Sequence, residues 1–410
     1  ADDYRLELQT SVSGEGVPPA ALDLVASGGL GGMTLQPLRL DVLDGRLRAN
    51  GRVRWDQGLS WELALEADQI NPGAYLADWP GELGGRIDVT GSLGAGDGEF
   101  KMHALIDNLV GRLRDYPVSA RGALDYRAGQ LHARAFEFAS GPNRIEVDGY
   151  AGEVLDLGFD VKAPELASLY PGLSGAIQGE GQLKGTRQLP VVVAKLSGQA
   201  VGHEDLHVQD LELDIDWREH GGKGRLLLSG VRAGDVPVAR LTAGLDGSPQ
   251  AHRLDLEGEA ESGSFRLSAR GGLQQELWTG ELQELTLNEP ALGEWSLQSP
   301  ARLSVGADKV QGGRLCLAQA ATSACAEGGW DRVRGLDLVG RVVEFDLARL
   351  SSHLPGEATI EGEIQADFRV AGSPARPDVR FELVPGDGMI RVEETDEPIE
   401  IAYRNARVSG

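Results

Sequence analysis

Residues 45–70 read GRLRANGRVRWDQGLSWELALEADQI, and this stretch decides the fold. Apolar side chains occupy alternate positions before and after a turn at residues 56–58, and mostly polar or charged side chains fill the positions between them. A period of two residues is typical of a strand with one apolar and one polar face. The apolar members are Leu47, Ala49, Val53, Trp55, Leu59, Trp61, Leu63 and Leu65.

The same alternation returns roughly every 10 to 14 residues almost to the end of the chain, which is hairpin spacing for an all-β protein. The turns between these segments carry Asp44-Gly45, Gly141-Pro142-Asn143 and Asp387-Gly388, residues that tight turns require. We predict that one apolar face continues along the chain. Besides the residues of the opening stretch, it contains Ile87, Val89, Leu211, Leu213, Ile215, Phe265, Leu267, Ile360, Ile364 and Phe368.

Glycine accounts for 57 of the 410 residues, about twice the usual share of roughly 7%. Glycine inside a strand often marks a bend or a close approach of two backbones. Glycines gathered on the apolar face would leave room for the sheet to curl around that face, although chance placement in a glycine-rich chain is the alternative. The glycines in this phase are Gly51, Gly91, Gly149, Gly179, Gly181, Gly258, Gly271 and Gly362.

The formal net charge is −24, with 25% charged residues. Nucleic acid and anionic membrane surfaces select basic proteins, so the charge argues against both as partners. No apolar run approaches the ~18 residues that a transmembrane helix needs, and the first residues do not resemble a signal peptide. We interpret residues 1–410 as one continuous, repetitive fragment of a longer protein, whose anchor and C-terminal end lie outside it.

Three segments interrupt the alternation with short helical patterns, at residues 71–81, 163–172 and 346–356. Each begins near an Asn, Pro or Asp and ends in Pro-Gly, which are helix start and stop signals. Each is followed by a strand pattern. The recurrence indicates an internal repeat with units beginning near residues 71, 163 and 346.

Several longer segments resemble the TamB family. They read LADWPGELGGRIDVTG, LASLYPGLSGAIQGEGQLKG, HLPGEATIEGEIQADFRVAG, SGPNRIEVDG and LGEWSLQSPARLSV. The resemblance covers most of the chain and is strongest at residues 71–91, 131–183 and 285–372. It implies an all-β fold with a few short helices, in which a long curled sheet forms a U-shaped trough called a β-taco.

The resemblance also implies a function and a location. The family belongs with AsmA-like and bridge-like lipid transfer proteins, is anchored in the inner membrane of Gram-negative bacteria and extends into the periplasm. It is implicated in carrying phospholipids toward the outer membrane, with phospholipid acyl chains in the apolar groove. The alternative role is a chaperone-like scaffold for outer-membrane protein and autotransporter clients, working with an outer-membrane barrel of the Omp85 class. We expect no enzymatic activity, no cofactor and no metal.

Periodicity alone leaves the fold open, because a series of β-sandwiches or an extracellular adhesin array would show the same alternation. The resemblance favours the trough. Aromatic residues make up only 5% of the chain, which suits a wide trough better than a filled sandwich. A trough with a dry interior would shield lipid tails, which cost about 0.8 kcal/mol for each CH₂ exposed to water.

Two further motifs carry possible chemistry. Cys316 and Cys325 flank a short loop, so in an oxidising compartment they predict a hairpin disulfide; two free thiols are the alternative. Residues 203–207 read HEDLH, which matches the HExxH signature of zinc proteases. The period-two pattern that follows indicates a strand instead of the required helix. We therefore expect neither a zinc site nor a protease.

Overall fold

The computed structural model describes residues 4–14, 16–56, 58–94, 99–186, 189–274, 277–353, 358–392, 399–404 and 406–410. Nearly all of them lie in β-strands, and the only helical elements in these ranges are three 3-10 segments. The chain divides into two compact units, unit 1 (Ala1–Glu219) and unit 2 (His220–Gly410). The all-β prediction is confirmed.

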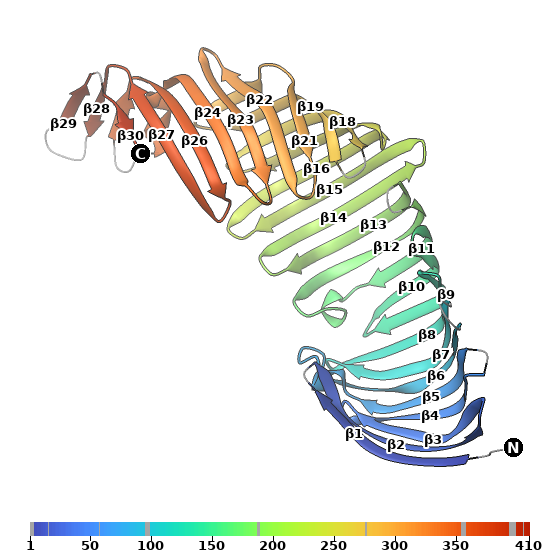
Figure 1. Cartoon of the computed structure of the whole chain (residues 1–410). Helices are drawn as coiled ribbons and strands as arrows, with labels where there is room; N and C mark the ends of the chain where they lie inside the picture. Colours follow the sequence, from blue (N-terminus) through green and yellow to red (C-terminus); the bar gives the residue numbers. More distant parts are fainter. Residues whose placement is uncertain are drawn as a thin grey trace. The chain divides into compact units, whose positions relative to one another are not determined.

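Unit 1 is an antiparallel sheet in which each strand pairs with the next one along the chain (Figure 1). This order follows from the short connections between strands. The strands are β1 (Tyr4–Gly14), β2 (Val17–Gly29), β3 (Gly32–Val42), β4 (Gly45–Arg54), β5 (Leu59–Ile70), β6 (Gly81–Leu93), β7 (Phe100–Leu113), β8 (Tyr116–Arg127), β9 (Gln130–Ser140), β10 (Asn143–Ala151), β11 (Val154–Ala163), β12 (Leu173–Thr186), β13 (Pro190–His203) and β14 (Leu206–Arg218).

In unit 2 successive strands also pair, with three irregularities, one of which is that the last strand, β30, pairs with β27. Two short strands, β20 and β21, share the space between β19 and β22, and β25, β28 and β29 form a separate small sheet. The strands are β15 (Gly221–Ala233), β16 (Val236–Ser248), β17 (Ala251–Ala260), β18 (Gly263–Gln274), β19 (Leu277–Glu289), β20 (Gly293–Leu297), β21 (Ala301–Val305), β22 (Lys309–Gln319), β23 (Thr322–Asp331), β24 (Gly335–Asp346), β25 (Ala358–Glu361), β26 (Glu363–Ser373), β27 (Arg376–Pro385), β28 (Gly388–Val392), β29 (Ile399–Tyr403) and β30 (Val408–Ser409).

The strands of unit 1 are bent along their length, as β1 to β5 show in Figure 1. Most neighbouring pairs contain a register shift, for example between Leu35 and Leu38 of β3 and between Ile106 and Leu109 of β7. A bulge of this kind bends its strand and increases the local twist. Gly51 also allows the strand to bend, because only glycine fits at this position. Its φ is +149°, and an added Cβ would lie 1.9 Å from the carbonyl oxygen of Glu62. The sheet therefore curls through bulges that a strict period of two does not predict.

The three predicted helical segments are 3-10 turns inside longer connections. They are η1 (Pro72–Ala74), η2 (Leu166–Ser168) and η3 (Leu347–His353); residues 354–356 of the third segment lie outside the described ranges. Closely following Pro and Gly residues leave too little chain for a stable α-helix. In the described part of the chain, no helix is both long and apolar enough to cross a membrane.

Candidate functional site

The apolar side chains of β4, β5 and β6 lie opposite one another across the sheet. Leu63 of β5 faces Gly51 on one side and Val89 on the other. Leu65 and Ile87 form the next pair in the same direction. Directly opposed residues share a face, so the predicted positions assemble into lateral rows. A cluster around Leu24, Ala26 and Leu35 extends these rows toward β2, with Met33, Leu38, Val53 and Leu63 packed against it.

The two faces of the sheet differ in exposure. Along β4 the odd-numbered residues are buried or half-buried and the even-numbered arginines are exposed, and β12 and β26 show the same alternation. The large apolar side chains Leu47, Leu63 and Leu65 stay only half-buried. In a β-sandwich a second sheet would bury such side chains completely. The apolar face therefore remains partly open, which favours the trough over the sandwich.

The predicted positions farther along the chain show the same pairing. In unit 1, Leu213 faces Leu196, and its neighbours Leu211 and Ile215 face Gly198 and Ala194.

In unit 2, Phe265 faces Gly258 and Leu267 faces Leu256, while Phe368 of β26 faces Gly340. All of these side chains are half-buried, as are Ile364 and Ile360.

Ile360 does not share a sheet with Ile364 and Phe368. The sequence predicted one strand through all three residues, but Gly362, with φ of +127°, separates β25 from β26. β25 then pairs with β28, so that Ile360 faces Ile390, while Ile364 continues in β26. This φ is one that glycine adopts readily and other residues do not.

Trp55 and Leu59 lie at the end of the rows, where the chain turns from β4 to β5. They are 40% and 41% exposed, whereas the next apolar residues toward the middle of the strands, Val53 and Trp61, are half-buried. The indole nitrogen of Trp55 donates a hydrogen bond to the backbone oxygen of Leu30, at 2.8 Å. Trp55 therefore ties two neighbouring turns together at the edge of the apolar face.

A buried polar network holds the η2 connection against the turn between β9 and β10. The amide nitrogen of Asn143 donates to the carbonyl oxygen of Glu165 at 2.7 Å and to Oγ of Ser168 at 2.5 Å, and its Oδ1 accepts from the backbone nitrogen of Glu165 at 2.9 Å. Ser140 and Ser168 each donate to the other's carbonyl oxygen at 2.8 Å. Sequence reasoning found the turn but missed this network.

The long connections also contact one another along the same end of the strands in unit 1. The ring of Trp79 lies 6.0 Å from that of Tyr170 and 5.2 Å from the guanidinium of Arg114. Arg114 also donates to the carbonyl oxygen of Ala167, and Tyr75 donates to that of Gly16 at 2.9 Å. The repeat-like insertions thus join turns that are not sheet neighbours and stiffen this end of the sheet.

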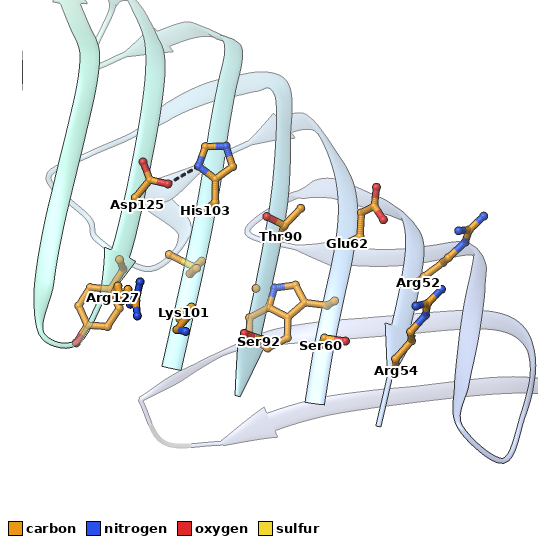
Figure 2. A pocket seen from close by; sticks show the side chains of 14 residues that line it. Arg52, Arg54, Ser60, Glu62, Thr90, Ser92, Lys101, His103, Asp125 and Arg127 are labelled. Carbon is orange, nitrogen blue, oxygen red and sulfur yellow. Dashed lines mark hydrogen bonds and ion pairs between the residues drawn. The ribbon is translucent and has the colours of Figure 1, made fainter. Parts of the chain in front are cut away.

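A shallow hollow of about 570 Å³ lies across β4 to β8, lined mostly by residues of the polar face together with Trp61, Gly91, Met102 and Tyr126. Figure 2 shows Arg52 and Arg54 at one end and Lys101 and Arg127 at the other. Ser60, Glu62, Thr90, Ser92, His103 and Asp125 complete the labelled lining.

Several charged groups of this hollow form ion pairs with one another or with charges beside it. Asp125 accepts a hydrogen bond from His103 and forms an ion pair with Arg134, each at 2.7 Å. The hydrogen bond from Arg127, followed by that from Lys101, lowers the pKa of the Glu99 carboxyl. Exposed pairs of this kind contribute little to stability. We therefore regard the polar face as the solvated side of the sheet.

A family model described as "TamB, N-terminal domain" matches residues 1–410. The chain belongs to the TamB family. It is 24% identical over 301 residues to the translocation and assembly module subunit TamB of Haemophilus influenzae, and the match covers 70% of this chain and 23% of that protein. The matched region therefore spans less than a quarter of the curated relative's length. No solved structure matches the chain.

The HEDLH motif of this TamB-family chain lies on a hairpin. His203 ends β13 and Leu206 begins β14, so the turn falls within the motif. His203 pairs with Leu206, whereas His207 pairs with Gly202. Adjacent positions of a strand point to opposite faces, so the two histidines lie on opposite sides of the sheet. A zinc protease needs both on one face of a helix, and the described residues contain no group of three or more His, Cys, Asp or Glu side chains placed to hold a metal ion.

A disulfide joins Cys316 of β22 to Cys325 of β23. The two residues are direct partners in the strand register, so the bond fixes the alignment of this hairpin. For a loop of about ten residues, the chain-entropy model gives roughly 2.5–3 kcal/mol of stabilisation. The disulfide lies beside Arg314 and therefore borders the charged, polar face.

We expect the stability of the turn after β23 to depend on pH. Asp331 accepts hydrogen bonds from the backbone nitrogens of Arg334 and Val333 and from the Arg334 side chain, and these lower its pKa, with the Arg334 backbone as the largest cause. The stabilisation is therefore complete above the ordinary aspartate pKa and disappears as the pH falls through the lowered value.

Carbon NMR of the carboxyl groups should give Asp331 a midpoint below the ordinary aspartate value. Arg334→Gln should move this midpoint upward but not fully, because both backbone donors remain. An ordinary midpoint for Asp331 in the unsubstituted protein would contradict the proposed role of this turn.

Proposed function

We propose that this chain forms part of a periplasmic bridge that carries phospholipids between the inner and outer membranes. The acyl chains would lie on the apolar face and the headgroups would remain in water. In this proposal the longer protein is anchored in the inner membrane and works in a translocation and assembly module with an Omp85-type outer-membrane barrel. Neither catalysis nor a cofactor is needed.

The observation that carries the proposal is the half-buried apolar face, which recurs in both units. Rows such as Leu63 with Val89 and Phe265 with Leu287 present hydrocarbon without interruption by charge. A lipid tail gains about 0.8 kcal/mol for each CH₂ that leaves water. Because the rows repeat from strand to strand, a tail finds similar surroundings as it moves across them. The disulfide supports an oxidising compartment such as the periplasm.

Site-specific photo-crosslinking tests this proposal. A photoreactive residue at Trp61 or Leu63 should crosslink to phospholipid in cells, and one at Glu62 or Arg54, on the polar face, should not. Mass spectrometry of the purified chain should also find phospholipid bound to it. Lipid crosslinks mainly from Glu62 and Arg54 would reverse the assignment of the faces, and an absence of lipid at all four positions would refute the proposal.

The half-open apolar face also supports a second function. Apolar side chains of an unfolded outer-membrane protein segment could pack on the rows that contain Leu63 and Val89. Crosslinks from Trp61 and Leu63 to client protein, without lipid at these positions, would favour this scaffold role over lipid transport.

A further inference from the structure

Large aromatic rings on the apolar face lie over glycines of the neighbouring strand. Trp61 faces Gly91 in the register, and a Cβ added to Gly91 would lie 2.2 Å from Cζ2 of the indole. Phe159 covers Gly181 in the same way, with a corresponding distance of 2.6 Å.

The arrangement recurs in unit 2. Phe265 faces Gly258, where an added Cβ would lie 2.2 Å from the ring, and Phe368 faces Gly340, where it would lie 2.1 Å away. Trp278 lies diagonally over Gly271, at 2.5 Å. These glycines do more than permit a bend, because the ring occupies the space that any side chain would need.

A ring that lies over a glycine protrudes less from the sheet than one that stands upright. Burying its face against the backbone also keeps it in place, as in the pairing of aromatic residues with strand glycines. In unit 1, Trp61 is followed by Phe100 at 5.9 Å and Phe100 by Tyr126 at 5.7 Å, measured between ring centroids, and these rings are tilted to one another by 34° and 55°. Of the three rings, Trp61 is the one that lies over a glycine, and its low position keeps this end of the row from rising above the backbone.

We propose that Gly91, Gly181, Gly258 and Gly340 are positioning residues that hold the facing rings flat, and so keep the height of the apolar face low enough for acyl chains to pass. This inference rests on the proposed lipid transport. It gives the glycines a second role besides letting the sheet curl: they leave space above the apolar face for the acyl chains. It also explains why each of these large aromatic residues lies opposite the smallest residue.

The structural step can be tested without lipid. In the protein labelled with fluorotryptophan, the Trp61 signal is assigned by its loss in Trp61→Phe. Gly91→Ala should shift this signal, because the new methyl group displaces the ring. Gly158→Ala is the control for the glycine substitution itself: it adds the same methyl to a strand of unit 1, on the polar face between Asp148 and Gln182, where the nearest atom, the carbonyl oxygen of Asp148, is 3.8 Å away. An unshifted Trp61 signal in Gly91→Ala would overturn the proposal.

The functional step uses exchange of fluorescent phosphatidylethanolamine between vesicles of phosphatidylethanolamine and phosphatidylglycerol. Gly91→Ala should slow the exchange, Gly158→Ala should not, and Trp61→Ala combined with Gly91→Ala should restore it by removing the raised ring. The role of the glycines would be overturned if Gly91→Ala displaced the ring without slowing exchange, or if the double variant were as slow as Gly91→Ala. Either result would leave the proposed lipid transport intact. No exchange and no bound lipid in the unsubstituted protein would instead remove the proposed function on which it rests.

Discussion

Leu63→Arg is expected to block lipid movement along the apolar face while the sheet remains folded. Leu63 lies in the row between Gly51 and Val89 and packs against the Leu24, Ala26 and Leu35 cluster. A charged side chain in a hydrocarbon environment costs about 2.5–3.5 kcal/mol on insertion scales. This energy adds to the barrier for lipid passage, so the rate of lipid exchange should fall roughly 10²-fold. The half-open face lets the arginine reach water, so the fold tolerates it.

The measurement is the same vesicle exchange assay, with circular dichroism to verify the fold. Thr90→Arg is the matched control, since it places an equal charge on the exposed face of the adjacent strand, opposite Glu62. It should leave exchange unchanged. Equal exchange in Leu63→Arg and the unsubstituted protein would argue against a continuous path across β5.

Asn143→Ala is expected to cause the largest loss of stability among single polar substitutions in unit 1. Asn143 is 1% exposed and makes three hydrogen bonds to the η2 connection. Alanine leaves the backbone nitrogen of Glu165 without this partner, while the carbonyl oxygen of Glu165 still accepts from the backbone nitrogen and Oγ of Ser168. One unsatisfied buried group costs about 1–3 kcal/mol, so the total loss should be about 2 kcal/mol.

Urea unfolding of the whole chain, followed by circular dichroism, should show a lower midpoint for Asn143→Ala. Hydrogen exchange should show a less protected Glu165 amide. Asn143→Asp should be at least as harmful, because a carboxylate cannot donate to the Glu165 carbonyl oxygen. Asn108→Ala, an exposed position on β7, is the control and should have little effect. Unchanged protection at Glu165 in Asn143→Ala would mean that other contacts hold the connection.

The alternation in residues 45–70 correctly predicted strands with one polar and one apolar face. That pattern is local: each side chain's face follows from its own position in the strand. The sequence also predicted the Cys316–Cys325 pair, because two cysteines around a short turn are close in space. The continuity of the trough over residues 1–410, which the repeats suggest, stays a prediction.

Properties that depend on partners distant in the sequence were missed. Asn143 looked like an ordinary turn residue, because its burial is decided by Glu165 and Ser168 in a later connection. The 3-10 turns were expected as helices, since their start and stop signals are the same as those of helices.

The sequence by itself determined the all-β class, the two chemically distinct faces and the family. The tertiary structure decided where the strands bulge, where Gly362 diverts the chain into a second sheet, and that the rings of Trp61 and Phe368 lie over glycines. The physical reason is the range of the interactions. Alternation depends on neighbours two residues apart, whereas bulges and ring positions depend on register, which only pairing with another strand defines.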